Sequence, residues 1–263
     1  MNFEIAGRAV SLFLEGKKSG ARIRFFGGEP ILNFPVIVKT IEFAKKRQKG
    51  IVFDLTTNGR LLSGKILEKI KKQSGLELIL SSGSGRAIEP ALLKKISRLP
   101  DVSVNLNLWP GDLKKAPETL EFFIASGFER FNFLPAFYIK WNGRQLAELK
   151  KCFDSLAEII KETKGIQVKN LAVNSPWPLF NAALTVDCNG DVYAGNFFLD
   201  KRMEFLKNEM RLGNISGMNS LKSAEMPFEL NFKKLLEMSF EEDTLESTAR
   251  ADRELTRFCR KIK

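Results

Sequence analysis

The chain alternates short apolar segments with amphipathic helical segments, and this rhythm limits its fold more than any other feature. A helix over residues 3–14 opens the pattern. Strands followed by helices are then expected at five places, near residues 22–26, 51–55, 76–80, 102–108 and 131–134. Strands and helices that alternate at this spacing form right-handed crossovers and a parallel sheet or barrel. The sequence therefore predicts an α/β fold.

The alternation stops after a helix that carries Leu149 and Ile160. Residues 183–187 and 192–193 are β-prone, and Cys188-Asn189-Gly190-Asp191 lies between them. An Asn-Gly pair between two such segments is typical of a tight β-hairpin. We therefore expect a small second domain built on a hairpin.

The boundary between the two domains is expected within residues 166–178, where two prolines flank Trp177. This divides the chain into a domain over residues 1–170 and a C-terminal domain over residues 171–263. The tail from Leu230 onward has the charge pattern of a helix on the protein surface.

Histidine is absent from all 263 residues, and this excludes Ser-His and Cys-His catalytic pairs and imidazole metal sites. Cys152, Cys188 and Cys259 are too few and too far apart for a disulfide framework or a local metal clip. No apolar run approaches the ~20 residues of a membrane span, and no signal segment opens the chain. We expect a cytoplasmic protein without a membrane partner.

Polar and glycine-rich turns follow the expected strands. In parallel β-α folds these strand ends open onto one rim, where ligands bind. A Gly-Gly pair lets a ligand approach the backbone closely, and an adjacent carboxylate suits an ammonium group. Tight turns alone also explain such dipeptides. The segments are Gly27-Gly28-Glu29-Pro30, Thr57-Asn58-Gly59, Ser81-Ser82-Gly83, and Asn105 with Asn107.

In order and spacing, the GGEP segment at 27–30 and the TTNG segment at 56–59 resemble the radical S-adenosylmethionine superfamily. The hairpin at 185–193, followed by Leu-Gly-Asn-Ile at 212–215, resembles the SPASM or twitch domain of its peptide-modifying and protein-modifying branch. The resemblance implies a partial (β/α)6 barrel of the TIM type with a small α+β domain. It also implies a hydrogen atom abstracted from a peptide or protein substrate.

The resemblance further implies that S-adenosylmethionine lies across the rim. Its ammonium would meet the turn at 27–30, with Glu29 near it, and its ribose would lie near Asn58 and Ser81. The complete implied cofactor-binding set is Gly27, Gly28, Glu29, Pro30, Thr57, Asn58, Ser81 and Asn105.

The family holds a [4Fe-4S] cluster through a CxxxCxxC segment after its first strand, and this sequence has no such segment. Its three cysteines lie in the wrong segments to hold such a cluster. Ala194-Gly195 stands where the C-terminal domain of the family usually has a cysteine. Cys188 is expected to be a small buried side chain. We predict no metal ligands in this chain. We expect an enzyme lacking its first strand and cluster segment, truncated before Met1. The alternative is a cluster-free, catalytically silent scaffold for a peptide or protein partner.

An aromatic stretch from Phe131 to Trp141 could line the core or form a binding platform, with the core favoured. The formal net charge of +11 permits a nucleic-acid partner. Its lysines are spread over separate helix faces without a known binding motif, so nucleic acid is the weakest of the three hypotheses.

Overall fold

The computed structural model describes residues 1–15, 20–83, 88–172, 184–196, 199, 201–221 and 241–263. The chain divides into two compact units. One contains residues 1–55, 72–77 and 180–239, and the other contains residues 56–71, 78–179 and 240–263.

Six strands form one sheet in the order β1-β2-β3-β4-β5-β6, of which the alternation predicted the first five. The pairs β1–β2, β3–β4, β4–β5 and β5–β6 are parallel. The strands are β1 (Arg22–Phe25), β2 (Val52–Thr57), β3 (Leu76–Ser81), β4 (Val102–Leu108), β5 (Arg130–Pro135) and β6 (Gln167–Val168).

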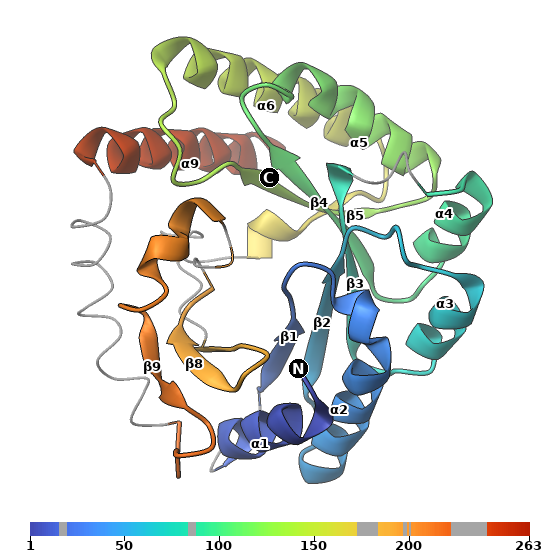
Figure 1. Cartoon of the computed structure of the whole chain (residues 1–263). Coiled ribbons are helices and arrows are strands. Elements are labelled where there is room, and N and C mark those ends of the chain that lie inside the picture. Colours follow the sequence, from blue (N-terminus) through green and yellow to red (C-terminus); the bar gives the residue numbers. More distant parts are fainter. Residues whose placement is uncertain (16–19, 84–87, 173–183, 197–198, 200, 222–240) are drawn as a thin grey trace. The chain divides into compact units, whose positions relative to one another are not determined.

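Helices alternate with these strands, which confirms the predicted α/β class (Figure 1). They are α1 (Phe3–Leu14), α2 (Phe34–Arg47), α3 (Gly64–Lys71), α4 (Pro90–Ser97), α5 (Ala116–Ala125), α6 (Gly143–Glu162) and α9 (Glu242–Ile262). Short 3-10 helices add η1 (Pro30–Asn33), η3 (Leu113–Lys115), η4 (Lys169–Ala172) and η6 (Lys201–Leu206).

In the first unit, α1 packs on α2, where the rings of Phe3 and Phe43 meet edge to face at 5.6 Å. Another face of α1 covers a three-stranded antiparallel sheet of β7 (Leu184–Val186), β8 (Asp191–Ala194) and β9 (Arg211–Asn214). The Arg8 guanidinium donates to the carbonyl of Met218 at 2.8 Å, just beyond β9. This sheet contains the predicted hairpin, and Gly190 takes a φ of 86° in its turn.

In the second unit, β4 and β5 alternate between two environments. Val104, Leu106, Phe131 and Phe133 are buried on the side that the helices cover. This places the first half of the aromatic stretch in the core, as favoured from the sequence. Trp141 is buried as well, and its ring N–H donates to the carbonyl of Ala136 at 2.8 Å.

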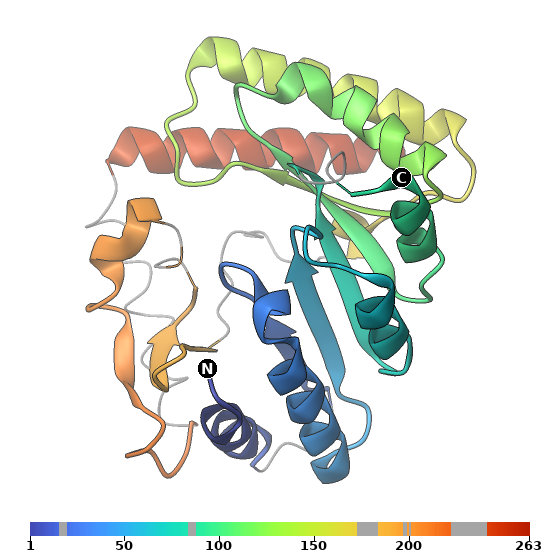
Figure 2. The same ribbon diagram turned by 45° about the vertical axis from the view of Figure 1, so that its right-hand side comes forward.

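The charged tail was expected to form a helix on the protein surface, and residues 242–262 do form helix α9, but one face of it is buried. Figures 1 and 2 show α9 beside α6. Phe258 of α9 stacks on Phe153 of α6 at 4.9 Å and meets Phe133 of β5 at 5.0 Å. Arg257 and Lys261 also form ion pairs with Asp154 of α6, each at 3.2 Å. One face of α9 thus belongs to the core.

The predicted domain division between residues 170 and 171 stays a prediction, and its Pro-Trp-Pro segment lies outside the described residues. None of the helices in the described part of the chain is long and apolar enough to cross a membrane.

Candidate functional site

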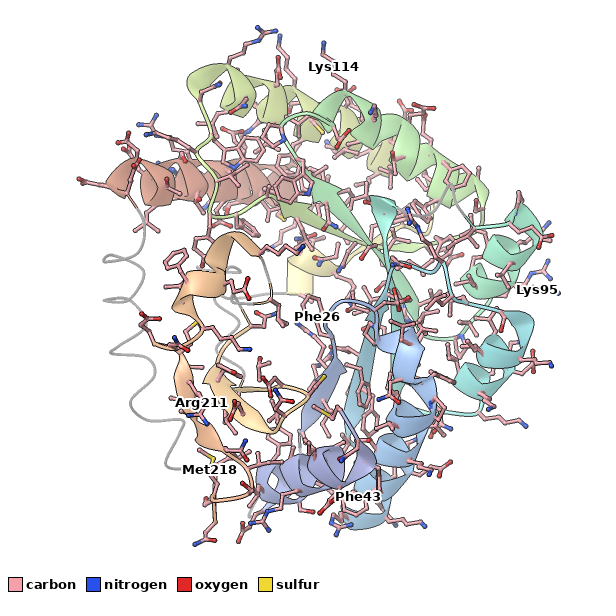
Figure 3. The ribbon with its side chains drawn as sticks, in the orientation of Figure 1. Phe26, Phe43, Lys95, Lys114, Arg211 and Met218 are labelled. Carbon is pink, nitrogen blue, oxygen red and sulfur yellow. The ribbon has the colours of Figure 1, made fainter. Side chains whose placement is uncertain are left out.

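The turn from Gly27 to Pro30 joins β1 to η1 in the first unit. Gly27 has a φ of 142°, a conformation that favours glycine, whereas Gly28 has no such constraint. A Cβ added at either glycine would meet no atom within 4 Å. Phe26, which precedes the turn and is labelled in Figure 3, is half exposed. The backbone of this turn is therefore open to a ligand.

Glu29 places a carboxylate beside this open backbone. One of its oxygens accepts a hydrogen bond from the N–H of Ile31 at 3.1 Å, which caps η1. Pro30 occupies the first turn of η1, where the N–H that a proline lacks is not needed. The cap fixes the side chain, so that the turn offers a positioned negative charge and exposed backbone groups.

In the second unit, the predicted residues Thr57 and Asn58 hold their own turn together. The Thr57 hydroxyl accepts from the N–H of Gly59 at 3.0 Å, and the Asn58 side-chain oxygen accepts from the N–H of Arg60 at 2.9 Å. Gly59 has a φ of 76°, and a Cβ there would lie 2.5 Å from the end of Ile88. The TTNG segment thus forms a closely packed turn that requires glycine.

Ser81 and Asn105 are brought together as neighbours across β3 and β4. The same register continues from Asn105 to Asn132 on β5, and the Asn132 amide donates to the Asn105 side-chain oxygen at 3.2 Å. These three residues form what we call the polar row, on the face opposite the buried Val104 and Phe131. Both asparagines are only partly buried. The row offers neutral donors and acceptors to a ligand.

Asn132 is a member of the polar row that the sequence reasoning missed. It lies between two fully buried phenylalanines, so its segment looks like ordinary core strand. The signal that could have found it is the two-residue period of β5, which places Asn132 on the other face.

Asn170 anchors the strand that carries Asn132. Its side-chain oxygen accepts from the N–H of Phe133 at 2.8 Å, and its side-chain nitrogen donates to the carbonyl of Phe133 at 3.0 Å. It thereby extends the pairing of β5 beyond the two residues of β6. Nearby, Lys169 donates to the hydroxyl of the buried Ser103 at 3.4 Å.

The cysteines do not fit an iron–sulfur cluster. Across the described ranges, no group of three or more His, Cys, Asp and Glu residues could hold a metal ion. Cys152 is buried on α6, and this burial raises its pKa to about 12; burial also raises the pKa of Cys259 on α9. Cys188 is exposed in the hairpin turn, so its expected burial is wrong. The N-terminal cluster segment expected before Met1 stays a prediction.

A polar network holds the hairpin in place. Asp187 accepts hydrogen bonds from the N–H groups of Asn189 at 2.9 Å and Asp191 at 3.1 Å. Arg211 of β9 donates to Asp191 at 2.8 Å, which lowers the pKa of that carboxyl (Figure 3 labels Arg211). Burial, together with the adjacent Asp187, raises the pKa of Tyr193 to about 12. The described residues of this small sheet are thus joined by side-chain hydrogen bonds and ion pairs.

No protein-family model matches the chain. One curated relative, the uncharacterized protein MJ0907 of Methanocaldococcus jannaschii, is 35% identical over 74 residues, which make up 27% of this chain and 26% of that protein. The chain therefore matches only about a quarter of that relative.

Two solved structures are similar over most of the chain. Native anSMEcpe with bound AdoMet and Cp18Cys peptide has a TM-score of 0.70 at 18% identity, over 100% of this chain and 90% of that chain. SuiB of Streptococcus suis bound to S-adenosylmethionine has a TM-score of 0.60 at 16% identity, over 89% of this chain and 61% of that chain. At this level of identity the likeness shows the fold alone. The chain therefore shares the α/β fold of these two structures, as its motifs predicted.

Proposed function

We propose that this chain binds S-adenosylmethionine together with a peptide or protein substrate. The observation that carries the proposal is the turn at 27–30, where open backbone adjoins the fixed carboxylate of Glu29. The amino-acid part of S-adenosylmethionine carries an ammonium group, which carboxylate and carbonyl oxygens accept well. Support comes from anSMEcpe and SuiB, which share the fold and were solved with this ligand.

The polar row is the part of the second unit that we assign to the ribose. A ribose hydroxyl both donates and accepts, and the side chains of Ser81, Asn105 and Asn132 can do the same. Because the two asparagines are partly buried, hydrogen bonds there compete less with water than bonds on an open surface. We assign to Thr57 and Asn58 the shaping of the turn that follows β2.

S-adenosylmethionine supplies a sulfonium centre, whose reductive cleavage in radical enzymes needs an iron–sulfur cluster. The thiols in the described residues do not fit such a cluster. We therefore assign to this chain the binding and orientation of the ligand and of a peptide, with no radical-forming step. The peptide is proposed because anSMEcpe was solved with one.

A catalytically silent scaffold that binds a peptide or protein is the second candidate. The positions of the three cysteines favour it, since two are buried or half-buried on helices and one lies alone in a turn. The two candidates differ in one measurable property, because only the first requires affinity for S-adenosylmethionine.

Calorimetry with S-adenosylmethionine tests the proposal through Gly28→Ala. The free protein has room for this methyl group and no backbone strain against it, so only a closely bound ligand would be displaced. We expect the dissociation constant to rise about tenfold or more, which corresponds to ~1.4 kcal/mol. Gly143→Ala is the matched control, since that glycine also has open space and no positive φ.

Glu29→Gln is the companion variant. Glutamine keeps an oxygen for the N–H of Ile31 and removes only the charge, and the loss of a charge-assisted contact costs about 1.5–3 kcal/mol. Glu4→Gln, on the exposed first turn of α1, controls for a general change in charge. Equal affinity in wild type, Gly28→Ala and Glu29→Gln would remove the turn from the site. No binding by wild type would leave the scaffold as the function.

A further inference from the structure

Two arginines project from one face of β1. Arg22 and Arg24 alternate with Ile23 and Phe25, so that their side chains share a face of the strand. Phe25 lies on the other face, stacked on Phe53 of β2 at 6.4 Å, where Lys45 of α2 reaches the Phe53 ring. The arginine face is therefore the one that α2 does not cover.

A single buried carboxylate holds both arginines. Asp54 lies opposite Arg24 in the β1–β2 register and is completely buried. One of its oxygens accepts from Arg22 at 2.7 Å, and the other accepts from Arg24 at 3.3 Å. The group of Arg22, Arg24 and Asp54, which we call the arginine pair site, carries a net charge of +1.

Both arginine side chains remain accessible. Their exposed fractions are 53% for Arg22 and 45% for Arg24. Each guanidinium donates to Asp54 through one nitrogen, Nη1 of Arg22 and Nε of Arg24. A guanidinium has several N–H donors in a fixed fork, so within the described residues most donors of each arginine are left for another acceptor.

Neutralising Asp54 does not by itself explain this arrangement. One arginine with a bidentate fork satisfies both oxygens of a carboxylate. Here two arginines each give a single bond, and Asp54 fixes where their remaining donors lie. Two guanidinium groups lie side by side here, and together they outweigh the single negative charge of Asp54. They therefore suit a planar oxyanion as a ligand better than they suit a neutral ligand.

We propose that the arginine pair site binds a carboxylate of the peptide substrate, either an acidic side chain or the C-terminal carboxyl group. This proposal rests on the proposed function in one respect, which is that a peptide supplies the carboxylate. Arg24 precedes Gly27 by three residues, or about 10 Å of extended strand. A peptide that reaches the turn can therefore also reach the arginines.

The test is a titration of the full chain followed through the side-chain Nε–Hε signals of its arginines. N-acetylglutamate is the carboxylate probe, N-acetylglutamine amide, which has no carboxylate, is its uncharged counterpart, and inorganic phosphate is the competing oxyanion. We expect N-acetylglutamate to shift the signals of Arg22 and Arg24 saturably, and N-acetylglutamine amide to leave them in place.

Variants then test whether the bound carboxylate contacts these arginines. Arg24→Lys retains a cation for Asp54 and removes the fork, and we expect its affinity for N-acetylglutamate to fall about tenfold. Arg211→Gln is the matched control, since Arg211 is also half exposed and paired to an aspartate, and it should bind as wild type does. The wild-type spectrum carries the test even if a variant does not fold.

Three results would overturn the inference: no shift with N-acetylglutamate, equal shifts with N-acetylglutamine amide, or equal losses in Arg24→Lys and Arg211→Gln. Tighter binding of phosphate than of N-acetylglutamate would assign the arginines to phosphate and overturn the peptide assignment. None of these results depends on affinity for S-adenosylmethionine, so failure here is distinct from failure of the proposed function.

Discussion

Phe258→Ala tests whether the C-terminal helix is part of the core. Phe258 is 1% exposed and contacts the rings of Phe153 and Phe133 at centroid distances of 4.9 and 5.0 Å. Truncating a buried phenylalanine costs ~3–5 kcal/mol, and the two aromatic contacts place the loss in the upper part of that range. This is a large share of the ~5–15 kcal/mol that stabilises a typical protein.

The assay is urea unfolding of the full chain, followed by circular dichroism. Phe258→Leu keeps most of the volume, and we expect it to lose less than half as much stability as Phe258→Ala. Phe205→Ala is the control, since Phe205 is 57% exposed and should change the free energy of unfolding by less than about 0.5 kcal/mol. A loss below about 1 kcal/mol for Phe258→Ala would refute the packing of α9 described above.

Three further predictions concern a turn, a carboxyl group and a thiol. Gly59→Ala should destabilise the protein by about 1–2 kcal/mol in urea unfolding, because alanine is strained at a φ of 76° and the end of the Ile88 side chain must move away from the added methyl group; a neutral change would contradict this geometry. Burial raises the pKa of Asp252 above its unfolded value, so the wild type should lose stability as the pH rises from about 4, and Asp252→Asn should remove that slope in urea titrations at several pH values. Cys188 should react with a thiol reagent well before Cys152 and Cys259, whose pKa values are raised by burial, and equal rates would contradict the burial of those two.

Local sequence patterns were sufficient to predict most of the helices and strands. The helix at Phe3–Leu14 and the strand at Val102–Leu108 were predicted with the bounds that the structure has, because their apolar periods are long and unbroken. The two residues of β6 contain too little pattern to be recognised.

Pairings between distant residues could not be predicted. The contact of Asn132 with Asn105 depends on the register of two strands that are joined by a helix, and no local signal specifies that register. The same is true of Asp54 and Arg24, which are 30 residues apart. The packing of α9 on α6 joins residues about 100 positions apart. Because many of the residues of α9 are charged, the sequence showed little sign of the buried face to which Phe258 belongs.

The most direct test of the account is an amide NMR titration of the wild-type chain with S-adenosylmethionine. We predict saturable shifts of the backbone N–H signals of Gly27 and Gly28 and of the side-chain amide of Asn105, with the Gly143 signal unchanged. Shifts that do not saturate, or saturable shifts confined to other parts of the chain, would contradict the claim that this fold retains a binding site for S-adenosylmethionine at these residues.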